Sequence, residues 1–496
     1  MFIYTLYVNY FMIKGQVNIS GQFHGMEERE HYLVRNPANT EEIVASFPKL
    51  KREDVKTAIE SAKNAFKLWS TKKPVERSQV LYKASQIIES KAEELAILLT
   101  KEEGKPIADS MFEIIRTINL LRFYGTLITQ EAGRVIPSQD NDTFIFTRRE
   151  PLGVVGIITP WNFPLSLPAW KIIPALATGN TVVWKPASIT PTIGMELVKI
   201  FYEAGLPSGV LNYVTGSGNE VGDEIITNED VDGMSFTGSL EVGKDINKKV
   251  GNRKRFTRLQ LELGGKNAVV LTKNGNINLA IEQVVRSAFG VTGQACTATS
   301  RFIVPEDIAE TVLNKLIERT KKLAIGNGLD KGIDMGPLAS QEQLDKYLYY
   351  VELGKKEGAK LVYGGNRLVN EEFKRGYFVE PTIFDRVSPD MRIAKEEIFA
   401  PVISVLKYKT LDEAIEIVNG IEYGLVAGII TNDPKEMKAF MENVKVGVVK
   451  INKPTIGLEP WVPYGGVKSS GNDVYKEMGV EAINFYTTIK AVYQGY

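Results

Sequence analysis

Apolar residues recur every three or four positions through much of the first 130 residues, which is the spacing of a helix with one buried face. The pattern predicts a helix over 52–70, a second over 75–100 and a third over 107–130. Gly104 and Pro106 follow the second stretch and are typical of a helix end. We expect these three helices to serve as scaffold.

The pattern changes to strand-like alternation over 133–150, on both sides of a polar turn at 139–142. The final residues, 480–496, alternate in the same way and predict a closing strand. A hairpin with a polar turn and apolar arms can project from the body of a subunit. We therefore expect it to serve an oligomer interface.

Strands and helices alternate from Gly153 onward. The predicted strands are 153–158, 181–185, 211–215 and 233–236, and the predicted helices are 165–178, 192–204, 219–227 and one from about Leu240. Continuous apolar runs such as GVVGII at 153–158 are typical of a parallel sheet that is buried on both faces. Repeated units of this kind predict a doubly wound α/β domain, which binds ligands beyond the carboxyl ends of its strands. The stretch 264–444 alternates again and predicts a second α/β unit.

The loops after these strands are rich in glycine, proline and small polar residues. No loop has the GxGxxG spacing of the dinucleotide fingerprint, and Gly216-x-Gly218-x3-Gly222 differs from it by one residue. Glycine turns after strands are usually only turns. Backbone N–H groups at the helix start after Gly238 could still hold a pyrophosphate.

Composition excludes several classes of function. Apolar residues make up 44% and charged residues 24% of the 496, and 60 basic residues balance 60 acidic ones. Net charge therefore gives no argument for a nucleic-acid or membrane-surface partner. The apolar residues 1–13 are too short to span a bilayer and lack the features of a signal peptide. The chemistry of the protein must therefore be inferred from individual residues and motifs.

Cysteine and histidine are scarce. Cys296 is the only cysteine, and the two histidines, His24 and His31, lie near the N-terminus. One cysteine excludes an intramolecular disulfide and a structural zinc site, and it fits a reducing cytoplasm. We expect no metal site. Any base that serves Cys296 is then expected to be a carboxylate.

Cys296 lies in a loop of small and hydroxylated residues, FGVTGQACTATSR at 289–301, after a predicted helix that begins near 278. A lone cysteine can be a small, inert core residue. It can equally be a nucleophile held over a cleft. The loop by itself leaves both interpretations open.

Seven motifs together resemble the aldehyde dehydrogenase superfamily, over about residues 36–493. They are PWNFP (160–164), WKPAS (184–188), FTGS (236–239), LELGGK (261–266), GQACTA (293–298), EEIFAPV (396–402) and YGGVKSSG (464–471). The resemblance implies a dinucleotide-binding domain of residues 1–130 and 151–263 and a catalytic domain of residues 264–444. It also implies an oligomerisation arm of residues 131–150 and 475–496 in a homodimer or homotetramer, in the cytoplasm.

The resemblance also implies the roles of individual residues. Cys296 would attack the aldehyde carbon, Asn162 would stabilise the oxyanion, and Glu262 would activate the water that hydrolyses the thioester. The cofactor-binding residues would be Ile158, Thr159, Pro160, Trp161, Lys185, Ser188, Gly218, Gly222, Phe236, Thr237, Gly238, Ser239, Leu263, Glu397 and Phe399. The substrate-lining residues would be Phe163, Ser166, Leu167, Trp170, Thr455 and Ile456.

The expected cofactor is NADP or NAD, with NADP favoured because Ser188 stands where NAD-preferring members commonly carry glutamate. The expected substrate is a short aliphatic semialdehyde such as succinate semialdehyde or 2,5-dioxopentanoate. The alternative is a non-phosphorylating glyceraldehyde-3-phosphate dehydrogenase. Ala295 argues against it, because that branch tends to carry arginine at the position before the cysteine. A CoA-acylating enzyme typically lacks the base, and a non-enzymatic relative normally lacks the nucleophile. Glu262 and Cys296 argue against these two classes.

Overall fold

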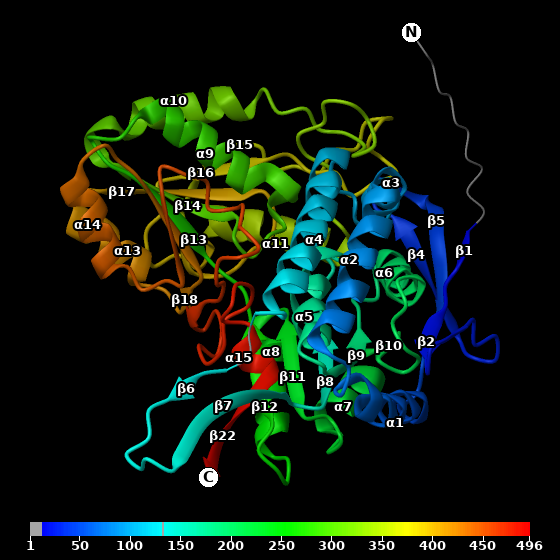
Figure 1. Cartoon of the computed structure of the whole chain (residues 1–496). Coiled ribbons are helices and arrows are strands. Elements are labelled where there is room, and N and C mark those ends of the chain that lie inside the picture. The colour runs from blue at the N-terminus through cyan, green and yellow to red at the C-terminus, as the bar shows by residue number, and fades with distance from the viewer. Residues whose placement is uncertain (1–11, 131–132) are drawn as a thin grey trace.

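The computed structural model describes residues 12–130 and 133–496, and the expectation for residues 1–11 lies outside them. Two seven-stranded sheets form the body of the molecule (Figure 1). The first has the order β12-β11-β8-β9-β10-β2-β3. Its parallel strands are β8 (Val154–Ile158), β9 (Thr181–Lys185), β10 (Leu211–Tyr213), β11 (Gly233–Thr237) and β12 (Arg258–Glu262).

The sequence pattern did not predict the two antiparallel strands at the edge of this sheet, β2 (Val17–Ile19) and β3 (Gln22–His24). Nor did it predict the small sheet of β1 (Ile13–Lys14), β5 (Asn39–Pro48) and β4 (His31–Asn36). Strands β1, β2 and β3 have only two or three residues and are too short to show a period. Strands β4 and β5 have six and ten residues, and no element was expected in that stretch. The four expected parallel strands of the doubly wound domain are all present, because each is a run of apolar residues buried on both faces.

Helices cover both faces of the first sheet. They are α1 (Arg52–Trp69), α2 (Pro74–Ser90), α3 (Ala92–Glu103), α4 (Ile107–Leu127), α5 (Ser166–Ala177), α6 (Thr192–Glu203), α7 (Asp223–Thr227) and α8 (Leu240–Gly251). The single helix predicted over 75–100 is wrong: it is two helices, because Lys91 leaves the helical region (φ −106, ψ 13) between them. Gly104 ends α3 with φ +100, where a side chain would also meet Pro37 at 2.8 Å.

The second sheet has the order β15-β16-β17-β14-β13-β19-β20, and only β15 runs antiparallel to its neighbour. Its strands are β13 (Asn267–Leu271), β14 (Thr299–Pro305), β15 (Lys360–Tyr363), β16 (Thr382–Asp385), β17 (Val402–Tyr408), β19 (Val426–Ile430) and β20 (Val448–Ile451). The helices are α9 (Ile277–Phe289), α10 (Ala309–Thr320), α11 (Gln341–Lys356), α12 (Arg392–Lys395), α13 (Leu411–Asn419) and α14 (Pro434–Asn443).

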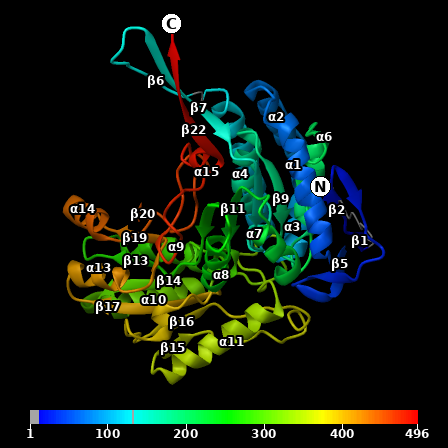
Figure 2. The same cartoon turned by 90° about the horizontal axis from the view of Figure 1, so that it is seen from below.

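A three-stranded sheet extends away from this body (Figure 2). Strands β6 (Val135–Ile136) and β7 (Thr143–Pro151) form the hairpin, and β22 (Thr487–Gly495) pairs with β7 along its whole length. The short helix α15 (Ile483–Tyr486) leads into β22. Two-residue strands β18 (Tyr423–Gly424) and β21 (Val467–Lys468) pair near the body. Across the described residues, no helix combines the length and the apolar character that a membrane span requires.

Candidate active site

An unusual backbone turn delivers Cys296 to the space between the two sheets. Helix α9 ends at Phe289, and Val291, Thr292 and Gly293 then follow one another in the left-handed region, with φ of 50°, 55° and 67°. Left-handed backbone costs roughly 1–2 kcal/mol for each residue other than glycine. A side chain at position 293 would also lie 2.5 Å from the carbonyl oxygen of Ala400. The turn is therefore fixed by packing as well as by sequence.

Asn267, at the start of β13, holds the loop from the other side. Its Nδ2 donates to the carbonyl oxygens of Cys296 and Ala298, at 2.7 and 2.9 Å. A Cβ at Gly265 would lie 2.7 Å from the same Cys296 oxygen, so the backbone needs glycine there. The direction of the Cys296 side chain is thus set by a rigid main chain.

The Cys296 thiol lies 3.2 Å from the hydroxyl oxygen of Tyr464. Tyr464 is buried and stacks edge-on against Trp170, with ring centroids 5.4 Å apart. Burial raises the pKa of Cys296 to about 12, and the Tyr464 hydrogen bond opposes that rise. Tyr464 is the first residue of the YGGVKSSG motif at 464–471, and the sequence indicated no role for it.

Asn162 lies against the cysteine loop and is buried. Its Nδ2 donates to the carbonyl oxygen of Gln294, two residues before Cys296, at 2.8 Å. The Lys105 ammonium donates to the Asn162 carbonyl and pairs with Glu113 at 2.9 Å, and both charged side chains are fully buried. Glu113 also accepts 2.8 Å hydrogen bonds from the backbone N–H groups of Leu165 and Ser166. A buried ion pair thus clamps the segment that carries Asn162.

Glu262 ends β12 and is 4% exposed. Its Oε2 accepts a 3.3 Å hydrogen bond from the N–H of Gly466. Burial raises the pKa of Glu262 well above its usual value, and the nearby Glu477 carboxylate adds to the rise. Glu477 is itself held by the buried Lys171 ammonium. The raised pKa makes the ionised Glu262 carboxylate a stronger base than an exposed glutamate.

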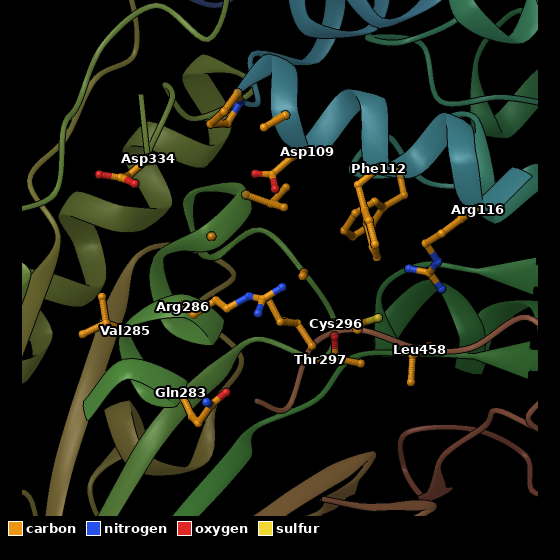
Figure 3. A pocket seen from close by; sticks show the side chains of 18 of the residues that line it. Asp109, Phe112, Arg116, Gln283, Val285, Arg286, Cys296, Thr297, Asp334 and Leu458 are labelled. Carbon is orange, nitrogen blue, oxygen red and sulfur yellow. The ribbon is translucent and has the colours of Figure 1, made fainter. Parts of the chain in front are cut away.

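A pocket of about 610 Å³ opens onto Cys296 (Figure 3). Of the predicted substrate residues, Phe163, Leu167, Trp170 and Ile456 line it. Ser166 and Thr455 do not: both are buried, and the Thr455 hydroxyl donates to the carbonyl oxygen of Thr297 at 2.6 Å. Sequence reasoning missed the lining residues that α4 and α9 contribute, among them Asp109, Phe112, Arg116, Gln283 and Arg286. Their only signal was the helical period, which does not tell a pocket face from a packed face.

Trp161, Glu397 and Phe399 are predicted cofactor residues that lie around the same glycine-rich segment. Trp161 and Phe399 stack edge-on with ring centroids 5.5 Å apart, and Phe399 has φ of 59°. The buried Glu397 carboxylate accepts a 2.8 Å hydrogen bond from the N–H of Gly265, and a Cβ at Gly264 would lie 2.2 Å from it. Burial raises the pKa of Glu397. Leu263, at the adjoining position, is buried against Gly243.

Other predicted cofactor residues follow strands β8 and β9. Lys185 ends β9 and is buried. Its ammonium donates a 3.1 Å hydrogen bond to the carbonyl oxygen of Pro186. Burial lowers the pKa of Lys185 to about 8. Ser188 is exposed and lies 3.5 Å from the carbonyl oxygen of Gly216. The hydroxyl of Thr159, which follows Ile158 and precedes Pro160, accepts a 2.9 Å hydrogen bond from Trp184.

The remaining predicted cofactor residues form two turns. Gly218 and Gly222 bound a single π-helical turn, and open space lies where a Gly218 side chain would be. Phe236 and Thr237 end β11, and a Cβ at Gly238 would lie 2.4 Å from the Phe236 ring. Ser239 caps α8, accepting from the N–H of Val242 at 3.4 Å. The open α8 N-terminus, the Lys185 ammonium and Glu397 are donor and acceptor groups that fit a dinucleotide.

Comparison with known proteins defines the class. A model of the aldehyde dehydrogenase family matches residues 24–492, and the chain belongs to that family. It is therefore an oxidoreductase that acts on an aldehyde with a nicotinamide cofactor, and the resemblance and the α/β fold class read from the sequence are confirmed.

Among similar proteins is the 2,5-dioxopentanoate dehydrogenase of Saccharolobus solfataricus, 50% identical over 467 residues, or 94% of this chain and 97% of that protein. The alpha-ketoglutaric semialdehyde dehydrogenase of Bacillus subtilis is 42% identical, over 96% of this chain and 97% of that protein. The crystal structure of betaine aldehyde dehydrogenase from Staphylococcus aureus in complex with NAD⁺ superimposes with a TM-score of 0.94. It is 34% identical and covers 98% of this chain and 95% of that one.

Proposed function

We propose that this enzyme oxidises a short semialdehyde, 2,5-dioxopentanoate in particular, to the carboxylic acid through a thioester on Cys296. The observation that carries the mechanism is that the Cys296 thiol lines a pocket, that Asn162 is hydrogen-bonded to the loop that carries Cys296, and that the buried Glu262 carboxylate is close enough to act on the thiol through its charge. The two similar semialdehyde dehydrogenases support the substrate, because 2,5-dioxopentanoate and alpha-ketoglutaric semialdehyde are one compound.

Cys296 is the nucleophile in this proposal. The thiol first loses its proton to water, and the thiolate sulfur attacks the aldehyde carbon, so that the carbonyl oxygen becomes an oxyanion. The Asn162 amide and the Cys296 backbone N–H donate hydrogen bonds to that oxygen, and a donor of this kind is worth roughly 3 kcal/mol in other enzymes. The Lys105–Glu113 pair holds the Asn162 segment in place during the step. The thioester forms when the aldehyde hydrogen leaves the Cys296 adduct as a hydride. A bound nicotinamide cofactor supplies the hydride acceptor.

Glu262 is the base for the second half of the reaction. Its ionised carboxylate takes a proton from water, and the resulting hydroxide attacks the thioester carbon and releases the acid from Cys296. The raised pKa of Glu262 makes its carboxylate a stronger base than an exposed glutamate. The Gly466 N–H, at 3.3 Å, orients the carboxylate.

NADP is the proposed preferred cofactor. Ser188 is neutral and exposed, so a 2′-phosphate at that position would meet no carboxylate. Lys185 and Ser188 can both donate to the adenosine ribose. In this proposal Trp161 and Ser239 would contact the pyrophosphate region, and Glu397 and Phe399 would contact the nicotinamide ribose and ring. The absence of a repulsive group is the argument for NADP over NAD.

The decisive test separates the two half-reactions. Cys296→Ser should abolish aldehyde oxidation and retain cofactor binding, because only the thiol chemistry is lost. Glu262→Gln should still release about one equivalent of reduced cofactor per site in a rapid burst, while steady turnover collapses. Steady turnover that survives in Glu262→Gln would show that another group is the base.

The remaining assignments are part of the same proposal. Residues 1–130 and 151–263 would bind the dinucleotide, residues 264–444 would carry the nucleophile, and the arm of 131–150 and 475–496 would join subunits in a cytoplasmic homodimer or homotetramer. The arm supports this because β22 offers a nine-residue outer edge, with Ile489 and Tyr493 exposed on it. Light scattering of the purified enzyme, with and without residues 487–496, tests it.

A further inference from the structure

Arg116 is a charged side chain in the Cys296 pocket without a polar partner among the described residues. Its Nε and Nη2 atoms are buried and donate no hydrogen bond there. Burial lowers the pKa of Arg116, which remains a cation because an arginine starts from a very high value. A buried, unpaired cation is costly in a protein, so it calls for an explanation.

Aromatic rings hold the Arg116 guanidinium in place. It lies 5.2 Å from the centroid of Trp170 and 5.6 Å from that of Phe112. Stacking of this kind leaves the N–H edge of the guanidinium free to bind a second group. Figure 3 shows Arg116 extending from α4 toward the part of the pocket where Cys296 lies.

Two carboxylates, Glu113 and Glu459, act on Arg116 through their charge, and within the described residues neither forms an ion pair with it. Glu459 is exposed at the surface. Glu113, one turn before Arg116 on α4, is bound to Lys105 and to two backbone N–H groups. At the other side of the pocket, Glu282 pairs with Arg319 at 2.8 Å. Asp109 and Arg286 also line the pocket, and the electrostatic partners of Asp109 are Lys105 and Arg286.

We propose that Arg116 binds the carboxylate of the substrate and makes the enzyme selective for aldehydes that carry a carboxylate at the far end of a short chain. The inference rests on the proposed function, in which the aldehyde end of the substrate lies at Cys296. Phe163, Leu167 and Leu458 line the same pocket and suit the methylene groups between the two ends. A guanidinium binds a carboxylate through two parallel hydrogen bonds, which fixes orientation as well as charge.

The test compares two five-carbon aldehydes, 2,5-dioxopentanoate and pentanal. Arg116→Met should lower kcat/KM for 2,5-dioxopentanoate on the order of 100-fold, mainly through KM, since charged hydrogen bonds in a desolvated site are strong. The same variant should change kcat/KM for pentanal less than about threefold, since pentanal has no carboxylate. Arg116→Lys keeps the charge but not the paired geometry, and it should lose roughly tenfold with 2,5-dioxopentanoate.

A binding measurement keeps the test independent of turnover. The product 2-oxoglutarate should protect Cys296 of the wild-type enzyme from iodoacetamide, and Arg116→Met should lose that protection. Arg122→Met is the matched control, because Arg122 lies on the same helix but pairs with Glu89 at the surface. Arg122→Met should leave kcat/KM for both aldehydes and the protection of Cys296 by 2-oxoglutarate unchanged.

Three results would overturn the inference. Equal losses with both aldehydes would assign Arg116 a structural role. Selective loss in Arg286→Met, with none in Arg116→Met, would move the carboxylate to the other arginine of the pocket. A wild-type enzyme that prefers pentanal would refute carboxylate recognition while leaving aldehyde oxidation intact. Failure of the proposed function is distinguishable, because the wild-type enzyme would then oxidise neither aldehyde.

Discussion

Tyr464→Phe removes one hydroxyl from the reacting sulfur and keeps the aromatic ring. When Cys296 is a thiolate it can only accept the hydrogen bond, so Tyr464 is then the donor across the 3.2 Å contact. A hydrogen bond to a charged acceptor contributes about 1.5–3 kcal/mol, which corresponds to roughly one to two pKa units. The variant should raise the thiol pKa by that amount, while the ring still packs against Trp170.

Alkylation by iodoacetamide measures this change without ambiguity, because the chain has one cysteine. At a fixed pH below the pKa, each unit of rise lowers the thiolate fraction about tenfold. A more basic thiolate is also more nucleophilic, with a Brønsted slope of about 0.4–0.5, which offsets nearly half of the loss. The net prediction is a roughly 3- to 20-fold slower alkylation at pH 8.

Tyr124→Phe is the control for this measurement. Tyr124 is buried in the same core cluster, and its hydroxyl donates to the carbonyl oxygen of Gly479 at 3.0 Å, away from the sulfur. Its loss should leave the alkylation rate unchanged. The reasoning is refuted if Tyr464→Phe alkylates at the wild-type rate, or if both variants slow it equally.

Four further results are expected. Asn162→Ala should slow the burst of reduced cofactor on the order of a hundredfold, measured by stopped flow, because an oxyanion donor is lost. Ser188→Glu should weaken NADP binding far more than NAD binding, and equal losses by fluorescence titration would show that the 2′ position is recognised elsewhere. The hydrolysis rate of the thioester should rise with pH through the raised pKa of Glu262, since only the ionised carboxylate accepts a proton, and Glu262→Gln should remove that limb of the profile. Lys105→Met leaves Glu113 buried without its cation, so thermal denaturation should show a loss of about 3–5 kcal/mol that a further Glu113→Gln partly restores.

The sequence predicted the helices and strands that have a clear pattern of apolar residues. The parallel strands β8, β9, β10 and β11 lie within a few residues of the predicted ranges, because an apolar run bounded by turn residues leaves little choice. The break at Lys91 was not predicted, since no glycine or proline marks it. The helical period continues across the break, and only tertiary packing separates the two helices.

The candidate site residues that lie within short motifs could be predicted from the sequence. Contacts between segments far apart in the chain could not. Cys296, Glu262 and Asn162 were proposed as catalytic residues from the short motifs around them, and that assignment stays a prediction. The contact between Cys296 and Tyr464 joins residues 168 positions apart, and no local pattern records it. Arg116 was not predicted for another reason. In the sequence, an arginine on a helix such as α4 looks like an ordinary surface residue. Only the structure shows that its Nε and Nη2 atoms are buried without a partner.

The partial burial of the one cysteine affects its reaction with oxidants. Peroxides react with thiolates, and the raised pKa of Cys296 keeps the resting group protonated, which makes it a slow target. No second cysteine exists in the chain to capture a sulfenic acid as an internal disulfide. A Cys296 sulfenic acid can therefore be reduced only by an external thiol. The enzyme is protected from oxidation as long as Cys296 stays protonated between turnovers.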